Sequence, residues 1–367
     1  MRVALVHDHL NQIGGAERVL KALADLFPDA PIYTAVYDER TVGSMFPKSR
    51  IRATWLQRFP LAKRHTQFYI LAIPHAFQAL DLSDYDLVIT DTSALAKGVK
   101  VNPHAVHLCY CHTPTRYLWR RTPEEYIHPL QRLPLVGTAI NYLVDLYKPW
   151  DFHAAQAVTQ FIANSKFIAG EIAKHYKREA IVVPPPVEIE QFTPSPLPDK
   201  QEGYFLILSR LRPYKKVDLA IQAFNRLNFP LVIAGEGQDR KRLERMAKAN
   251  IKFVGAVSDQ ERNKLFQGAC AFIHPQQEDW GITAVEAMAA GRPVIAYKAG
   301  GAMETVIPGV TGELFEEQSW QDLADMIIRF DPSRYDPFQI AKHASQFSPL
   351  RFQERIKEIV ESYGNRN

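Results

Sequence analysis

Basic side chains gather directly after a short apolar run in the second half of the sequence. Residues 209–216 read Ser-Arg-Leu-Arg-Pro-Tyr-Lys-Lys and hold four cations just before a predicted helix, 217–227. Arginine and lysine in such a loop can neutralise a diphosphate without a metal ion, and arginine can do so in a bidentate manner. A solvated basic loop is the alternative, but ligands of open α/β sheets bind beside the carboxyl ends of strands. We therefore expect Ser209, Arg210 and Lys215 to bind phosphate groups.

Two glutamates eight residues apart frame a second group of candidates. Glu278 precedes a predicted helix of small residues, and Glu286 is the only charge on that helix. A buried carboxylate needs hydrogen-bond donors, which a ribose diol would supply; a backbone N–H or a nearby arginine is the alternative. The N-terminus of the same helix, at Gly281, Ile282 and Thr283, is predicted to bind phosphate oxygens.

Glycines follow several of the predicted strands. Gly14 and Gly15 lie between the first strand and a helix, where a glycine turn lets backbone N–H groups approach an anion. Gly235 and Gly237 follow a strand of the second half, but Arg240 stands where a dinucleotide fingerprint has its third glycine. A tight turn without a ligand is the alternative at both places.

The segment 109–121 combines thiol, imidazole, hydroxyl, guanidinium and aromatic groups after a first-half strand. Such a loop is typical of a recognition surface, and its candidates are His112, Arg116, Tyr117 and Trp119. A zinc site from the histidines and cysteines of 107–112 has no C-x-x-C pair to support it, and residues of one strand alternate between faces. We expect no metal site.

The composition is that of a globular protein with more than one domain. The chain has 367 residues, of which 46% are hydrophobic and 23% charged, whereas one domain has roughly 150 residues. The longest apolar window, 133–144, is too short to span a membrane, and the first residues have too short an apolar core for a signal peptide. Three cysteines suit a reducing compartment, so we expect a cytoplasmic protein.

The net charge of +4 hides a local asymmetry. Residues 41–80 include no aspartate or glutamate, and their lysines and arginines alternate with aromatic side chains such as Trp55 and Phe59. This mixture attracts anions and favours a peripheral position on an anionic membrane; an ordinary basic helical face is the alternative.

Short β-branched apolar runs alternate with amphipathic helices, which predicts an α/β fold with parallel sheets flanked by helices. The predicted strands are 2–7, 86–90, 104–111, 161–164 and 180–183 in the first half, and 204–209, 230–234, 252–255, 271–274 and 293–297 in the second.

Six prolines between residues 184 and 198 exclude helix and central strand and indicate a break between the halves. A last helix, 349–363, has apolar residues on one face. We expect an N-terminal domain, a linker, a C-terminal domain and a final helical segment, which are residues 1–186, 187–200, 201–345 and 346–367.

These motifs together resemble the retaining nucleotide-sugar glycosyltransferases of the GT-B architecture, specifically glycosyltransferase family 4. The likeness covers nearly the whole chain and is strongest from about residue 204 to residue 315. It is carried by Gly14-Gly15-Ala16-Glu17, Ser209-Arg210-Leu211 with Lys215, Glu278 with Glu286, Ala299-Gly300-Gly301 with Glu304, and Thr311-Gly312-Glu313-Leu314. Residues 210–218 and 8–10 look most like the branch that includes bacterial polysaccharide mannosyltransferases.

The resemblance implies two Rossmann-like domains facing a cleft, the first on the acceptor side and the second binding the donor, with the last helix returning to the first domain. It assigns the donor diphosphate to Arg210 and Lys215, the donor sugar to Glu278 and His112, the ribose to Glu286, and the phosphates and sugar to the turn of Gly14 and Gly15. Lys216 departs from the family, which usually has glycine there, and Trp280 replaces another aromatic residue.

We therefore expect transfer of a sugar from a nucleotide-diphosphate donor to a hydroxyl of a glycan or lipid-linked acceptor. Retention at the anomeric carbon and no required metal or cofactor are part of this expectation. Mannose from GDP-mannose is the first donor, and glucose or N-acetylglucosamine from UDP the alternative. Arg116, Tyr117, Trp119 and Asp8 are expected on the acceptor side, and Asp8 is the carboxylate that the first half offers opposite the anomeric carbon.

Three other functions stay open on the sequence alone. A nucleotide-sugar epimerase leaves residues 41–80 without a role, and an NAD dehydrogenase lacks its third glycine. A nucleic-acid-binding protein leaves Glu278 and Glu286 unexplained, so we expect no nucleic-acid partner.

Overall fold

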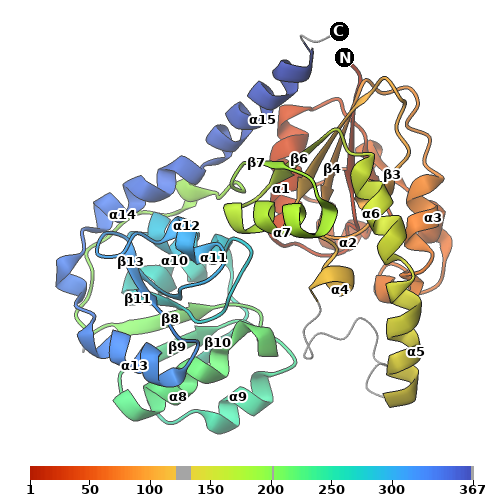
Figure 1. The fold of residues 1–367 in the computed structure, drawn as a ribbon. Helices are drawn as coiled ribbons and strands as arrows, with labels where there is room; N and C mark the ends of the chain where they lie inside the picture. The colour runs from red at the N-terminus through yellow and green to blue at the C-terminus, as the bar shows by residue number, and fades with distance from the viewer. Residues whose placement is uncertain (121–133, 201, 365–367) are drawn as a thin grey trace. The chain divides into compact units, whose positions relative to one another are not determined.

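A computed structural model describes residues 1–120, 134–200 and 202–364 of the chain. Internal contacts divide the chain into unit 1, Met1–Pro186 with Phe352–Asn367, and unit 2, Val187–Arg351. Each unit has one sheet of parallel strands with helices on both faces (Figure 1). The predicted fold class, two Rossmann-like parallel sheets, is therefore confirmed.

Unit 1 has seven parallel strands in the order β3-β2-β1-β4-β5-β6-β7. Its strands are β1 (Val3–His7), β2 (Ile32–Thr34), β3 (Ile51–Ala53), β4 (Leu87–Thr92), β5 (Val106–Cys111), β6 (Gln160–Ala163) and β7 (Ala180–Val182). Its helices are α1 (Gly15–Leu26), α2 (Glu39–Val42), α3 (Ile73–Gln78), α4 (Arg116–Trp119), α5 (Pro134–Asp145), α6 (Lys148–Gln156), α7 (Lys166–Tyr176) and α15 (Pro349–Gly364). The strand order reverses between β1 and β4, and both strands are buried along most of their length because helices cover the two faces.

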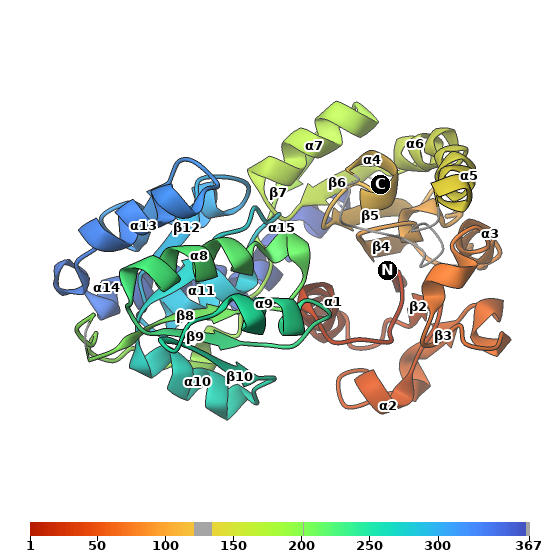
Figure 2. The ribbon, with the colours of Figure 1, turned by 90° about the horizontal axis from the view of Figure 1, so that it is seen from below.

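Unit 2 repeats this plan with six parallel strands in the order β10-β9-β8-β11-β12-β13. Its strands are β8 (Tyr204–Leu208), β9 (Leu231–Ala234), β10 (Ile251–Gly255), β11 (Ala269–His274), β12 (Val294–Tyr297) and β13 (Gly312–Phe315). Its helices are α8 (Val217–Leu227), α9 (Arg240–Met246), α10 (Asp259–Gly268), α11 (Ile282–Ala289), α12 (Ala302–Thr305), α13 (Trp320–Arg329) and α14 (Pro337–Ala344). Here the order reverses between β8 and β11. Helices α8 and α10 lie on opposite sides of β8 and β9 (Figure 2).

Sequence patterns located ten of these strands with ends shifted by at most two residues, but they missed β2, β3 and β13. The missed strands have only three or four residues each, too few to show a period.

The proline-rich segment 187–200, expected to be a linker, packs within unit 2. Val187 and Phe192 lie in the apolar core of that unit. The buried guanidinium of Arg292 donates hydrogen bonds to the carbonyl oxygens of Ser195 and Pro196, the latter at 3.3 Å. A segment that cannot join a sheet needs such donors for its carbonyl groups, so the arginine fixes it in place.

Helix α15 packs on unit 1, as the resemblance implied for the last helix. Phe352, Ile356, Ile359 and Val360 are buried in the same core as α1 and β1. The side-chain amide of Gln353 donates a hydrogen bond to the carbonyl oxygen of α1 residue Ala22 at 3.0 Å. The first domain is thus completed by residues from the far end of the chain.

Replacing Ile356 by alanine should therefore destabilise unit 1. Ile356 is fully buried, and removing such a side chain leaves a cavity that costs about 2–5 kcal/mol. Leu350 lies on the same helix but is 64% exposed, so Leu350→Ala should change the free energy of unfolding by less than about 0.5 kcal/mol. Urea denaturation of the two variants measures the difference, and equal losses would show that α15 does not contribute its apolar face to the core.

Candidate active site

The predicted site residues gather where the strand order of each sheet reverses. In unit 2, Arg210 and Lys215 follow β8 and Glu278 follows β11. In unit 1, the predicted His112 follows β5 and lies beside two residues that the sequence analysis did not propose, His7 at the end of β1 and Asp91 near the end of β4. Loops diverge at such a reversal and leave a crevice beside the carboxyl ends of the strands. Each unit therefore places its charged candidates where its own sheet can bind a ligand.

In unit 2, the two residues assigned to diphosphate and sugar contact each other. The ammonium group of Lys215 donates a hydrogen bond to Oε1 of Glu278, and both side chains are largely buried. Lys215 ends the short 3-10 helix Pro213–Lys215, and Lys216 then adopts a left-handed conformation with φ of 52°. This conformation explains why glycine is usual there in the family that the sequence resembles. Arg210, after β8, is exposed.

Gln276, which the sequence analysis missed, holds Glu278 in place and is itself in contact with His274. The amide nitrogen of Gln276 lies 3.1 Å from Oε1 of Glu278 and 3.2 Å from Nδ1 of His274. Because an amide nitrogen only donates, Nδ1 of His274 must accept, and the histidine carries its proton on Nε2. Burial lowers the pKa of His274 to about 3, which keeps the ring neutral. No sequence motif around His274 and Gln276 indicates that they contact each other or that Gln276 contacts Glu278.

The N-terminus of α11 has the form that phosphate binding requires. Gly281 caps this helix with a φ of 97° and no side-chain hydrogen bond. A Cβ at this position would lie 3.3 Å from Nε2 of His274. A side chain there is therefore disfavoured both by the positive φ and by this close contact. Ile282 and Thr283 begin the helix, where backbone N–H groups have no intrahelical acceptor.

The other second-half glycines lie against backbone, which agrees with the tight turn that the sequence left open at Gly235. A Cβ at Gly300 would lie 2.1 Å from the carbonyl oxygen of Glu278, and the N–H of Gly301 donates to that oxygen at 2.9 Å. A Cβ at Gly235 would likewise meet the carbonyl oxygen of Ser209 at 1.9 Å. These glycines let backbone pack against the loops that carry the candidates, and their contacts are with protein.

Glu286 is buried on α11 and lies 3.5 Å from a guanidinium nitrogen of Arg262. This pairing is the alternative that the sequence left open, since a nearby arginine satisfies the carboxylate without a ribose. Arg262 also pairs with Asp259 at 3.1 Å and donates to the side chain of Gln191 at 3.0 Å. The ribose role of Glu286 stays a prediction.

In unit 1, a row of buried side chains connects three neighbouring strands. Nδ1 of His7 lies 2.8 Å from Oδ2 of Asp91, and Nε2 of His112 lies 2.6 Å from Oδ1 of the same carboxylate. On its other side, Nε2 of His7 lies 3.7 Å from Oε1 of Glu17. Burial opposes protonation of His7, but the two carboxylates outweigh it and raise its pKa to about 10. The sequence pointed to His112 but not to this row.

The glycine turn before α1 is part of the same arrangement. Helix α1 begins at Gly15, and no side chain caps it at Gly14. A Cβ at Gly14 would lie 3.1 Å from a carboxylate oxygen of Glu17. The turn therefore leaves the helix N-terminus uncapped, as a phosphate-binding turn requires, and also makes room for Glu17.

Asp8, expected on the acceptor side, holds a loop of unit 1 instead. Its carboxylate oxygens accept hydrogen bonds from the backbone N–H groups of Ser93, Leu95 and Ala96 at 2.8–3.0 Å. The hydroxyl of Thr92 donates to both oxygens at 2.9 and 3.0 Å. With 6% exposure and donors on both carboxylate oxygens, Asp8 supports this loop, and its expected role on the acceptor side stays a prediction.

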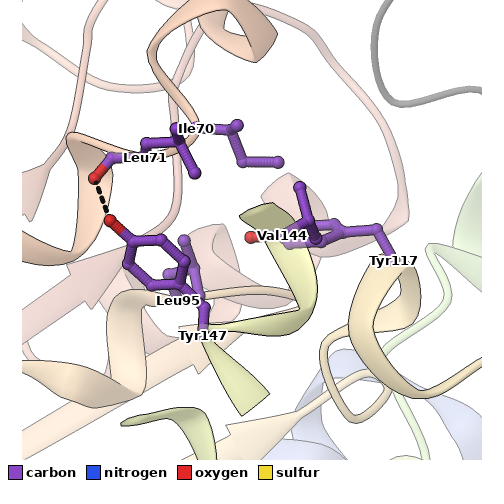
Figure 3. A pocket seen from close by; sticks show the side chains of 6 residues that line it. All are labelled: Ile70, Leu71, Leu95, Tyr117, Val144 and Tyr147. Atoms are coloured by element: carbon purple, nitrogen blue, oxygen red, sulfur yellow. Dashed lines mark hydrogen bonds between the residues drawn. The ribbon is translucent and has the colours of Figure 1, made fainter. Parts of the chain in front are cut away.

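The aromatic residues of the 109–121 segment are also more enclosed than expected. The indole N–H of Trp119 donates to the buried carboxylate of Asp151 at 2.7 Å, which binds the equally buried Lys97. Tyr117 lines a small apolar pocket (Figure 3), together with Ile70, Leu71, Leu95, Val144 and Tyr147. Arg116 begins α4 and, like His112, is partly exposed.

Among the described residues, no cluster of histidine, cysteine, aspartate or glutamate is arranged to hold a metal ion. Cys109 and Cys111, considered above for zinc, are residues of β5 and are buried in the core.

Two family models match the chain and together extend over both units. One is described as Glycosyltransferase Family 4 and matches residues 13–191; the other is described as Glycosyl transferases group 1 and matches residues 188–334.

Curated relatives match along most of the chain. The chain is 26% identical to human alpha-1,3/1,6-mannosyltransferase ALG2, over 98% of this chain and 95% of the relative. It is 25% identical to the Dictyostelium discoideum protein of the same name, over 86% of each.

Solved structures match the fold at lower identity. HepE of Anabaena in complex with UDP aligns with a TM-score of 0.70 at 19% identity, over 99% of this chain and all of that one. Sucrose-phosphate synthase of Thermosynechococcus elongatus aligns with a TM-score of 0.73 at 16% identity, over the full length of both.

The charge on His7 should make the stability of unit 1 depend on pH above neutrality. The folded chain keeps the proton up to about pH 10, whereas an unfolded histidine loses it near its ordinary pKa of 6.5. The free energy of unfolding should therefore fall as pH rises through this window, by at most about 1.4 kcal/mol per pH unit. His7→Gln should flatten the dependence, and the same change at the exposed His104 should not. Denaturation curves at several pH values measure this, and equal slopes in wild type and His7→Gln would contradict a protonated His7.

Proposed function

The chain belongs to glycosyltransferase family 4 and is a sugar-transferring enzyme, and from this premise we propose that it transfers mannose from GDP-mannose to a hydroxyl of a glycan or lipid-linked acceptor. The proposal includes retention at the anomeric carbon and no required metal ion. The observation that carries it is the contact of Lys215 with Glu278 beside the uncapped N-terminus of α11.

The choice of mannose rests on the curated relatives. The human and Dictyostelium proteins that share about a quarter of their residues with this chain are named mannosyltransferases. UDP-glucose is the alternative, because an Anabaena structure of similar fold contains that donor at 21% identity. This structural match supports the fold alone, and the choice of donor is tested by experiment below.

The proposed reaction places negative charge on the departing diphosphate as the bond to the anomeric carbon breaks. Arg210 and Lys215 supply fixed positive charge there, and the N–H groups at the start of α11 add hydrogen bonds. Together these groups do the work that a bound metal ion does in other transferases. Glu278 holds the ammonium group of Lys215 before the donor arrives, and Gln276 holds Glu278.

We expect GDP to raise the melting temperature of the protein, with and without EDTA, since a ligand that binds the folded state stabilises it. UDP, ADP and NADH should raise it less. Lys215→Gln should remove most of the GDP effect and lower kcat for mannosyl transfer by about 10²–10³. Lys241→Gln, an exposed lysine on α9, is the matched control and should change neither.

The outcomes of this experiment separate the alternatives. A larger shift with UDP would transfer the proposal to UDP-sugars, and loss of the shift in EDTA would overturn metal independence. Product analysis by NMR of the anomeric proton would test retention. Stabilisation by NADH alone would contradict the proposed donor class.

We also propose that residues 41–80 lie against an anionic membrane that carries the acceptor. Trp55, Phe59, Leu61, Phe68 and Leu71 are each at least 40% exposed in this stretch. The rings of Trp55 and Phe59 lie 5.4 Å apart, so part of this apolar surface is contiguous. Lys48 pairs with Glu39 at 3.4 Å, whereas the exposed Arg58, Lys63 and Arg64 give this surface a positive charge that complements anionic lipid.

A neighbouring helix extends the same surface. The hydroxyl of Tyr147 donates to the carbonyl oxygen of Leu71 at 2.8 Å and ties the residues after α5 to this stretch (Figure 3). Leu143 and Leu146 nearby are 46% and 56% exposed. In the described part of the chain, no helix has the length and apolar character needed to cross a bilayer.

Vesicle sedimentation tests this contact. The protein should bind vesicles of phosphatidylglycerol and phosphatidylcholine but not of phosphatidylcholine alone. The double variant Phe59→Ser, Leu61→Ser should weaken binding at least about tenfold, because burying each apolar side chain is worth about 1.5–3 kcal/mol. Ile328→Ser, Phe338→Ser changes two equally exposed residues of unit 2 and is the control. Equal binding by both double variants would exclude this surface.

A further inference from the structure

The row of charged side chains in unit 1 ends at the residue that the resemblance assigns to the donor sugar. His7 and Asp91 are paired residues of the neighbouring parallel strands β1 and β4, so their side chains share one face of the sheet. His112 follows β5, and its backbone N–H donates to the carbonyl oxygen of Thr92 at 2.9 Å. The side-chain amide of Asn164 donates to the carbonyl oxygen of His112 at 3.0 Å. The backbone of His112 is thus fixed from both sides.

The chemistry of the partners determines where the protons of this row lie. Each ring nitrogen of His7 faces a carboxylate, Asp91 at 2.8 Å and Glu17 at 3.7 Å, so both nitrogens carry protons. Oδ1 of Asp91 faces Nε2 of His112 at 2.6 Å, and a carboxylate can only accept. Nε2 of His112 therefore carries a proton, and in the neutral ring Nδ1 has the lone pair.

Burial distinguishes the last member of the row from the others. Glu17, His7 and Asp91 are at most 3% exposed, whereas the side chain of His112 is 15% exposed. Within the described residues, the bond from Nε2 to Asp91 is the side-chain hydrogen bond of His112, and Nδ1 makes none. A water-accessible acceptor nitrogen at the carboxyl ends of the strands is suited to accept a hydrogen bond from a hydroxyl group and not to bind a phosphate oxygen.

We propose that Asp91, fixed by protonated His7, is a positioning residue that holds His112 in its Nε2–H form and directs the Nδ1 lone pair at a hydroxyl group of the substrate. This inference rests on the proposed function, in which His112 contacts a sugar. No proton is transferred along the row; the row fixes the tautomer and the ring orientation. Asp91 itself does not contact the substrate.

Burying two carboxylates and an imidazolium costs free energy of folding. The arrangement is therefore expected to serve a purpose beyond stability. Apolar side chains of similar volume are often at least as stable as buried ion pairs. A buried carboxylate behind a histidine, by contrast, is an effective way to select one tautomer, because the wrong tautomer would place two acceptors against each other. The function of this row is to fix the orientation of the His112 ring.

NMR of protein labelled with nitrogen-15 at histidine tests the tautomer directly. The resonance of His112 is identified by its loss in His112→Gln. In the wild type we expect the neutral ring to be in the Nε2–H form, and Asp91→Asn should move at least a large part of the population to the other tautomer. Thr90→Val alters the adjacent buried residue of β4, on the opposite face, and should leave the resonance unchanged. A wild-type ring in the Nδ1–H form would overturn the inference, even if Asp91→Asn does not fold.

Kinetics test the role. Asp91→Asn should lower kcat about 10- to 100-fold, the range typical of residues that orient another group, and should change the KM for donor little. Adding Asp91→Asn to His112→Gln should cause no further loss, because the two residues act as one unit. Wild-type kcat in Asp91→Asn would overturn the positioning role. If the wild type turned over none of the tested donors, the proposed function would fail while the NMR result still decided the inference.

Discussion

A carboxylate that is buried at the edge of a sheet must have hydrogen-bond donors, because an unpaired buried charge costs far more than a single fold of this size can spare. In unit 1 this requirement organises the loops around the candidate site. Asp8 gathers three backbone N–H groups of the loop after β4, and Asp151 gathers Lys97, Thr115 and Trp119. Asp91 lies between two histidines. The loops that carry His112 and Arg116 are therefore held in place by the hydrogen bonds of these buried carboxylates.

Unit 2 meets the same constraint with cations that stay within reach of a ligand. Lys215 is paired with Glu278, but both side chains are 14–19% exposed, so a diphosphate can compete for the ammonium group. The glycines around them let two loops pack backbone to backbone, which fixes the pair without adding side chains. Lys216 accepts a left-handed conformation at a cost of about 1 kcal/mol to end the cationic loop and start α8. A fixed and partly accessible charge is thus present where the proposed reaction releases the diphosphate.

The sequence was sufficient for features that depend on local pattern. The predicted strand ends placed Lys215 and Glu278 correctly after the carboxyl ends of two strands, which are neighbours in the sheet. The alternation of strands and helices predicted both sheets. It was insufficient for features that depend on distant partners. Nothing near Asp8 indicates the N–H groups that follow β4, some 85 residues later, and nothing near His7 indicates Asp91. Strands of three residues, such as β2 and β3, show no period at all.

The commitment of Asp8 to a loop bears on how the proposed retention could occur. Retention by two successive displacements needs a carboxylate free to attack the anomeric carbon, and Asp8 was the candidate that the sequence offered in unit 1. Its oxygens are instead occupied by backbone and hydroxyl donors, and those of Asp91 by two imidazoles. Freeing either would leave several buried donors unpaired at about 1–3 kcal/mol each. In the proposed reaction, Arg210, Lys215 and the start of α11 therefore carry the charge of the departing diphosphate, and retention would follow from the face on which the acceptor hydroxyl enters.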